Sequence, residues 1–477
     1  MSRYAAAAPS WAFSISVWRA FFVLALVIGV SLAVTVPAAA ETLEQALVHA
    51  YTSNPDLNAQ RASLRATDEG VAEARAGYRP SLLATGDLGV NNVQTDSRGL
   101  GIRPTTKGPT SDGTTHPKGY AFTLNQPLYR GGRTINAVRE AEANVRAGRE
   151  NLRSVEQGVL LNAVIAYMDV VRDQAIVRLQ ENNVKVLTEQ LTATKDRFEV
   201  GEVTKTDVAQ AEARRSGSIS ELSAAQADLK SSRAVYEQII GHPPSNLSDP
   251  PPIETVLPRS LPEALQIGAA EDPDILAALK LEEAARYVVK QLIGETLPEI
   301  DVEARFEDRF ETSFITDAQE ATTVTGRLTV PLYSGGAPSA RVRGARNVQD
   351  QRRREIDSAR LESRAQMVAA WSRLVAARAQ VESDQAQVRA NRIALNGVRE
   401  EEKVGQRTIL DVLDAEQEYL DSQVSLVGTK RDLVVASFAL YAAIGRLDAR
   451  SLGLPVAYYD PEEHYNRVRR KLFGFRP

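Results

Sequence analysis

Hydrophobic residues recur at intervals of seven along residues 133–196, a stretch that contains no proline. After a four-residue step the row resumes, which is typical of a stutter in a coiled-coil seam. A similar row runs along 337–400. We therefore predict two long helices that pack in coiled coils. The first row is Val138, Val145, Leu152, Val159, Ala163, Val170, Val177, Val184, Leu191 and Phe198, and the second is Ile356, Met367, Leu374, Val381, Val388 and Leu395.

A period of two marks four shorter segments. In the clearest of them, Ile300, Val302 and Phe306 alternate with charged residues. Apolar and polar side chains on opposite faces predict strands. A soluble sheet packed on helices fits this pattern, and so does a transmembrane sheet with lipid on one side and water on the other. The four predicted strands are 82–93, 119–129, 299–310 and 321–332.

The long helices and the strands belong to two copies of one unit. Val200-Gly201 matches Val404-Gly405 at an offset of 204 positions, and Pro127-Leu128-Tyr129 matches Pro331-Leu332-Tyr333 at the same offset. Such a repeat determines the whole architecture. Each copy is expected to hold short helices, two strands, a long helix and a return helix, which is 205–241 in the first copy and 408–445 in the second. The expected divisions are a leader at 1–40, repeats at 41–241 and 259–445, a proline-rich linker at 242–258 and a tail at 446–477.

The element lengths indicate how the helices are stacked. A helix over 133–196 would be roughly 96 Å long at 1.5 Å per residue. The helix before the strands and the return helix together have nearly that length, so we expect them to lie end to end beside the long helix. The loop at 94–118, rich in glycine, proline, serine and threonine, is where the first copy carries its extra residues. The tail is expected to be irregular and to lie near mid-height.

The fold class is therefore mainly α-helical with a transmembrane β part. Four strands cannot close a barrel, because the smallest membrane barrels have about eight. An open sheet edge is not tolerated in lipid. We therefore expect several chains to share one barrel, and three chains would give twelve strands.

Composition narrows the possible functions. The chain has no cysteine, which excludes disulfides, thiol catalysis and a lipid anchor on an N-terminal cysteine. Its four histidines are far apart in the sequence, without the spacing of a metal site. An apolar run ending in Ala38-Ala39-Ala40 predicts a cleaved signal peptide. Removal of 1–40 would lower the formal net charge from −4 to −6, which argues against nucleic acid as a partner. We predict neither a catalytic site nor a cofactor.

The chain resembles the TolC family of outer-membrane efflux and secretion channels over nearly all of its predicted mature length. The resemblance rests on the tandem repeat, on the two Pro-Leu-Tyr segments followed by Gly-Gly, and on the turn sequence at 405–415. It implies a homotrimer with a β-barrel in outer-membrane lipid and an α-helical barrel across the periplasm. It also implies docking to a periplasmic adaptor, or membrane fusion protein, and to an inner-membrane transporter. The alternatives are a periplasmic coiled-coil adaptor and a structural protein of the cell envelope.

The resemblance also implies roles for residues near the second Val-Gly turn. Asp411 and Asp414 match two acids that ring the periplasmic entrance of the channel. Residues three apart share a helix face, so three chains would place six carboxylates around a narrow opening that favours cations. The alternative is that both acids are solvated residues in the first turn of a helix, where the helix dipole favours them.

Further residues match the links that hold the resting entrance closed in this family. Arg407 matches an arginine of one link, and Thr206 and Asp207 match its partners on the neighbouring coil. Glu402 departs from the family pattern, because an aromatic hydroxyl is expected there to bond the equivalent of Asp207. A glutamate facing Asp207 would repel it, so a leakier or differently locked gate is expected.

The two Val-Gly turns are the expected docking surface for the adaptor. Glycine permits a positive φ at such a turn and lets another backbone come close. The alternative is that glycine serves only to reverse the chain. The residues concerned are Val200, Gly201 and Thr204 in the first copy and Val404, Gly405 and Thr408 in the second.

Overall fold

The computed structural model describes residues 40–95, 111–253, 257–313 and 316–475, so the predicted leader lies almost wholly outside the described residues. In chain order, the first repeat contains α2 (Leu43–Ser53), α3 (Pro55–Ala76), β1 (Ser81–Leu88), β2 (Asn91–Thr95), β3 (Ser111–Thr115), β4 (Lys118–Arg130), α4 (Arg133–Glu199) and α5 (Lys205–Ile240). The second contains α6 (Leu261–Glu271), α7 (Pro273–Gly294), β5 (Glu299–Ser313), β6 (Thr316–Thr329), α8 (Ala337–Lys403) and α9 (Ile409–Ala443), and the tail contains α10 (Pro461–Val468).

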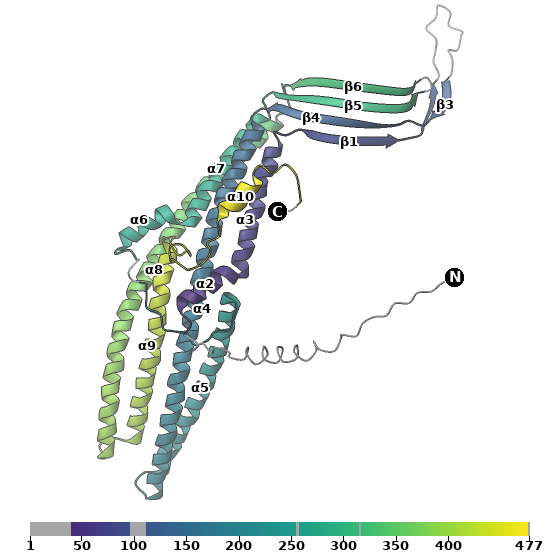
Figure 1. Ribbon diagram of the computed structural model, residues 1–477. Coiled ribbons are helices and arrows are strands. Elements are labelled where there is room, and N and C mark those ends of the chain that lie inside the picture. Colours follow the sequence, from purple (N-terminus) through teal and green to yellow (C-terminus); the bar gives the residue numbers. More distant parts are fainter. Residues whose placement is uncertain (1–39, 96–110, 254–256, 314–315, 476–477) are drawn as a thin grey trace, which may run out of the picture.

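The molecule is long and thin, with a sheet at one end and two helical hairpins at the other (Figure 1). Helix α4 has 67 residues and is therefore about 100 Å long. Helices α3 and α5 lie along its upper and lower parts, and α7 and α9 flank α8 in the same way (Figure 1). This is the stacking expected from the element lengths.

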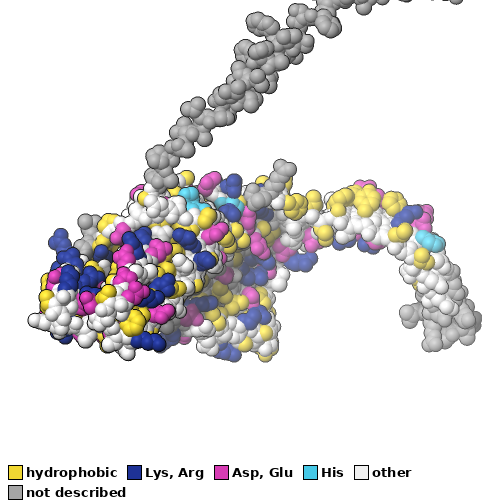
Figure 2. All heavy atoms as spheres, turned by 90° about the horizontal axis from the view of Figure 1, so that it is seen from below, with side chains coloured by type: hydrophobic (Ala, Val, Ile, Leu, Met, Phe, Trp, Pro, Cys, Tyr) yellow, Lys and Arg dark blue, Asp and Glu magenta, His cyan; other side chains and the backbone are white. Residues whose placement is uncertain are grey.

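Four strands form one antiparallel sheet in the order β1-β4-β5-β6. Residues directly paired across an antiparallel sheet share a face. One such row contains Leu82, Leu124, Ala304 and Val324. In the adjacent row, which lies on the other face, Arg305 stands between Thr123 and Thr323. Hydrophobic side chains gather along one side of the sheet (Figure 2). The sheet is therefore amphipathic, with one face suited to lipid and the other to water.

The prediction of one strand over 82–93 is wrong in one respect. Strand β1 ends at Leu88, which pairs with Lys118, the first residue of β4. Pro117 precedes that residue and cannot donate to a ladder, and its carbonyl oxygen accepts the Gly89 N–H at 2.8 Å. Beyond this point the chain turns into a separate two-stranded ribbon of β2 and β3. The expected loop at 94–118 thus contains β3, and its central part lies outside the described residues.

The main core lies at mid-height, where both repeats and the linker meet α4. Tyr167 and Tyr236 are completely buried there. The Tyr167 hydroxyl donates to the carbonyl oxygen of Glu41, and the Tyr236 hydroxyl donates to the Glu41 carboxylate, both at 2.7 Å. Burial, together with the hydrogen bond to Glu41, raises the pKa of Tyr236. Among the described helices, α4 alone has a stretch apolar and long enough to span a membrane, and half of that stretch is buried, as in a core helix.

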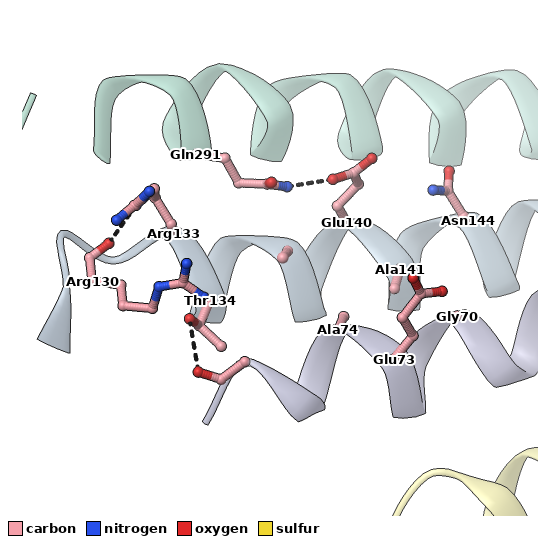
Figure 3. A pocket seen from close by; sticks show the side chains of 12 residues that line it. Gly70, Glu73, Ala74, Arg130, Arg133, Thr134, Glu140, Ala141, Asn144 and Gln291 are labelled. Carbon is pink, nitrogen blue, oxygen red and sulfur yellow. Dashed lines mark hydrogen bonds between the residues drawn. The ribbon is translucent and has the colours of Figure 1, made fainter. Parts of the chain in front are cut away.

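The two repeats make a close backbone contact just below the sheet. Gly131 has a φ of +61°, and a Cβ atom added there would lie 2.1 Å from the carbonyl oxygen of Gly294. Beside this contact, the Glu299 carboxylate accepts hydrogen bonds from Arg130 and Arg133 at 3.1 and 2.7 Å. Below these residues α3, α4 and α7 border an open hollow of about 590 Å³ (Figure 3). Its arginines are already paired with Glu299, so we assign it no ligand.

The tail is more ordered than predicted. Asp460 caps α10 by accepting the Glu462 N–H at 2.8 Å, and Pro461 occupies the first turn. His464 and Val468 lie one turn apart and are both buried. Helix α10 therefore has a buried stripe, which packs against α3 above mid-height (Figure 1). The expectation of an irregular tail at mid-height therefore holds for residues 446–460, several of which are buried in the main core, and is wrong for α10.

Candidate functional site at the hairpin tips

The two hairpins end in nearly identical turns. Gly201 and Gly405 have φ values of +82° and +75°, and the chain reverses at both. The Gly201 N–H donates to the Phe198 carbonyl oxygen at 3.0 Å, and the Gly405 N–H donates to that of Glu402 at 2.9 Å. A Cβ atom at either glycine would meet nothing within 4 Å. Glycine is therefore required at these positions by the positive φ, and the space around each turn is open in the single chain.

A capping box follows each turn. Thr204 and Thr408 are the N-caps of α5 and α9, and their backbone N–H groups donate to Asp207 and Asp411, both at 2.8 Å. Such reciprocal bonds satisfy donors that a helix start would otherwise leave unpaired. The backbone N–H of Thr408 is the main group that lowers the pKa of Asp411 below its usual range. Asp411 thus acts as a cap in the single chain, and Asp414 lies on the next turn of α9.

Near the tips, two ion pairs join the first hairpin to the second. Arg197 near the end of α4 binds Glu402 near the end of α8. Arg214 on α5 binds Asp414 on α9. A small apolar cluster of Leu187, Ile409 and Leu413 also packs the hairpins together. The tips are therefore held to each other within one chain by two charge contacts and a hydrophobic contact.

These contacts differ from the links expected from the sequence. Glu402 does not face Asp207, which is occupied as a cap; it binds Arg197 instead. The expected repulsion at Glu402 is therefore replaced by an attraction. Arg407 is exposed and its Nε lies 3.0 Å from a Glu401 carboxylate oxygen on its own hairpin. Thr206 is exposed in the first turn of α5.

Sequence reasoning missed Arg197 and Arg214, although the repeat contained a signal for both. At the offset of 204, Arg197 corresponds to Glu401 and Arg214 corresponds to Glu418. Two positions near the turns are thus positively charged in the first copy and negatively charged in the second. The partners themselves, Glu402 and Asp414, lie near these equivalent positions and not at them, so this charge difference marks the region of the contacts but not the pairs.

The described residues contain no cluster of histidine and acidic side chains that could hold a metal ion. The tips instead carry basic and acidic side chains next to two open glycine turns. An amphipathic sheet joined to coiled-coil hairpins of this length defines a class of protein, the outer-membrane channels with a periplasmic helical extension. Comparison with known proteins agrees with this class.

A family-wide sequence profile described as "Outer membrane efflux protein" matches residues 46–242 and 264–446, and the chain belongs to this family. The outer membrane efflux protein BepC of Brucella suis biovar 1 is 42% identical over 442 residues, covering 92% of this chain and 93% of BepC. The outer membrane protein TolC of Escherichia coli K12 is 22% identical over 429 residues, covering 87% and 84%. The crystal structure of the Campylobacter jejuni CmeC outer membrane channel superposes with a TM-score of 0.75 at 15% identity, covering 90% of this chain and 89% of CmeC.

The family confirms the predicted class, location and general function. The protein is an outer-membrane channel protein of the efflux and secretion type, and its relatives are channels rather than enzymes. The fold class is confirmed by the solved channels, although a single chain contains an open sheet and not a closed barrel. The alternatives of an adaptor and of an envelope structural protein find no support in this family.

Proposed function

We propose that three copies of this chain close into one channel that carries substrates from the periplasm, or from an inner-membrane pump, to the cell exterior. The observation that carries the proposal is the sheet order, which leaves β1 and β6 at the two edges of the described sheet. An unpaired edge in lipid is strongly unfavourable. Pairing β6 of one copy with β1 of the next removes all edges, and three copies give twelve strands.

The internal symmetry of the chain supports the geometry of this pairing. Strands β4 and β6 are equivalent in the two repeats, as are β1 and β5. The pairing of β4 with β5 inside the chain is therefore the template for β6 with β1 of the next copy. In the same way, the packing of α4 on α7 is the template for α8 on α3 of the next copy.

Exposed apolar residues on α8 support the same interface. Val368 is 38% exposed, whereas its equivalent in α4, Val164, is completely buried. Leu361 is 70% exposed, whereas its equivalent Gln157 is 7% exposed. Large apolar side chains on one side of a long helix indicate a contact surface. A neighbouring copy would bury this side of α8.

The assembled mass tests the proposal. Light scattering of the detergent-solubilised protein, with the detergent mass subtracted, is expected to give three times the mass of the processed chain. Leu361→Glu combined with Val368→Glu is expected to yield the mass of one chain, because burying two carboxylates without partners is unfavourable. Gln94→Glu, which adds a charge at an exposed site on the β2–β3 ribbon, should remain a trimer. A wild-type mass of one chain would contradict the shared barrel.

At the other end of the channel, we propose that the tips are the gate and the docking site for a periplasmic adaptor and an inner-membrane transporter. Val200 and Val404 are exposed apolar residues beside open glycine turns, which suits contact with another helical hairpin. In the trimer, Asp411 and Asp414 from three copies would surround the entrance and favour cations. The pairing of Asp414 with Arg214 reduces the negative charge of that ring, so Asp411 would dominate it. The energy for transport would come from the pump.

A further inference from the structure

The end of the chain is fixed to the upper part of α3. Val468 is completely buried, and Nδ1 of the buried His464 lies 3.1 Å from Oδ2 of Asp68, which is also completely buried. Buried polar groups need their partners, so this contact and the apolar one together determine the position of α10. The residues that follow α10 therefore start from a defined place on the surface.

The chain beyond α10 is then held beside the base of the sheet. Nη1 of Arg75 donates to the carbonyl oxygen of Arg469 at 3.3 Å, and Nη1 of Arg79 donates to that of Lys471 at 2.8 Å. Arg79 precedes Ser81, the first residue of β1, by two positions, or about 7 Å of chain. The tail thus approaches the level at which the helices give way to the sheet (Figure 1).

The composition of this segment is unusual for a surface in water. Leu472, Phe473 and Phe475 are 71%, 88% and 108% exposed. Exposed large apolar side chains that follow one another mark a site of interaction. Immediately before them stand four cationic residues, and basic residues next to exposed aromatic ones are typical of segments that lie in the membrane interface. The cationic residues are Arg467, Arg469, Arg470 and Lys471.

The surroundings of the tail favour a lipid partner over a protein. Tyr78, Tyr129 and Tyr333 are exposed and lie near the ends of β-strands where the helices begin. Tyrosines at that level form the girdle by which membrane barrels contact the headgroup region. Tyr78 adjoins Arg79, which holds the tail at Lys471, so the tail aromatics directly follow a residue that is fixed near this level.

We propose that residues 469–475 are a non-covalent anchor to the periplasmic leaflet of the outer membrane. Leu472, Phe473 and Phe475 enter the boundary between headgroups and acyl chains, and the preceding cations lie at the phospholipid phosphates. The inference requires that the sheet spans the membrane, and it is independent of the number of chains in the barrel.

The absence of cysteine makes a direct test possible, because one introduced cysteine can be labelled alone. A nitroxide would be placed at Leu472→Cys in the full-length protein, reconstituted in vesicles of phosphatidylethanolamine and phosphatidylglycerol. Collision of the nitroxide with oxygen, which is concentrated in lipid, would be compared with collision with a water-soluble nickel chelate. Val200→Cys at the hairpin tip is the matched control, because Val200 is 72% exposed and lies at the opposite end of the molecule (Figure 1).

The ratio of oxygen to nickel collisions is expected to be several-fold higher at residue 472 than at residue 200. Adding Phe473→Ser and Phe475→Ser should lower the ratio at 472 to that of the control, since these side chains supply the insertion. A ratio at 472 equal to that of the control in the otherwise unchanged protein would overturn the proposal. So would shielding of the nitroxide from both reagents, which would place the tail against protein.

Discussion

Replacing both Arg197 and Arg214 by alanine should raise the resting conductance of the channel in planar lipid bilayers several-fold. Each arginine forms an ion pair between the two hairpins of one chain. An exposed ion pair contributes about 1 kcal/mol or less. Six such contacts in a trimer sum to several kcal/mol, and each 1.4 kcal/mol changes the ratio of closed to open states about tenfold. Loss of all six pairs should therefore shift the tips towards separation.

Two further variants distinguish gating from a general loss of stability. Arg354→Ala removes a highly exposed arginine whose nearest acid, Asp357, is on the same helix, and it should leave the conductance unchanged. Exchanging the charges of one pair, with Arg197→Glu and Glu402→Arg together and Arg214 unchanged, should give the low resting conductance of the wild type. The pair can form again with its charges reversed. A double alanine variant with wild-type conductance would show that the pairs do not hold the tips.

Gly131→Ala is expected to have the largest effect on stability. The added methyl group would meet the Gly294 carbonyl oxygen at 2.1 Å, and neither the Cβ nor this backbone oxygen can move away by a side-chain rotation. A positive φ costs a residue with a Cβ about 1–2 kcal/mol, and overpacking adds about 1–3 kcal/mol. We expect an unfolding midpoint many degrees below that of the wild type, measured by circular dichroism, and little protein in the outer membrane.

The neighbouring glycine supplies the control for this prediction. Gly132 has a φ of +75°, but its nearest neighbour for an added Cβ is the Asn136 side-chain nitrogen at 3.8 Å, an ordinary contact. Gly132→Ala should therefore suffer only the backbone strain, about 1–2 kcal/mol. Equal destabilisation of the two variants would mean that the close approach of α7 to the turn after β4 is not important.

Much of this fold could be predicted because the repeat and the periodicity are long-range signals. The glycines with a positive φ at 131, 201, 335 and 405 are visible in the sequence as matched Gly-Gly and Val-Gly turns. They mark where α4 and α8 begin and end. The end of β1 could not be predicted. Its alternation continues loosely past Leu88, and only the position of Pro117 on the partner strand ends the ladder.

The partners of Arg197 and Arg214 at the tips could not be predicted, for a different reason. A sequence indicates which residues lie near a turn, but the face of one hairpin that meets the other depends on how the coiled coils twist. Asp207 and Asp411 could be recognised as caps from their spacing to threonine, because a capping box is local. Arg197 and Glu402 are 205 positions apart, and their contact depends on the packing of α4 beside α9.

The charge difference between the repeats has a consequence for symmetry. In a ring of six identical hairpins, every equivalent position would carry the same residue and every contact between neighbours would be the same. Fusing two hairpins in one chain lets neighbours differ, and Arg197 and Arg214 stand where the other copy has Glu401 and Glu418. Around the proposed trimer, contacts within a chain, which carry the Arg197–Glu402 and Arg214–Asp414 pairs, would alternate with contacts between chains that need not carry them. Duplication followed by divergence thus permits a ring whose members attract one another and whose true symmetry is threefold rather than sixfold.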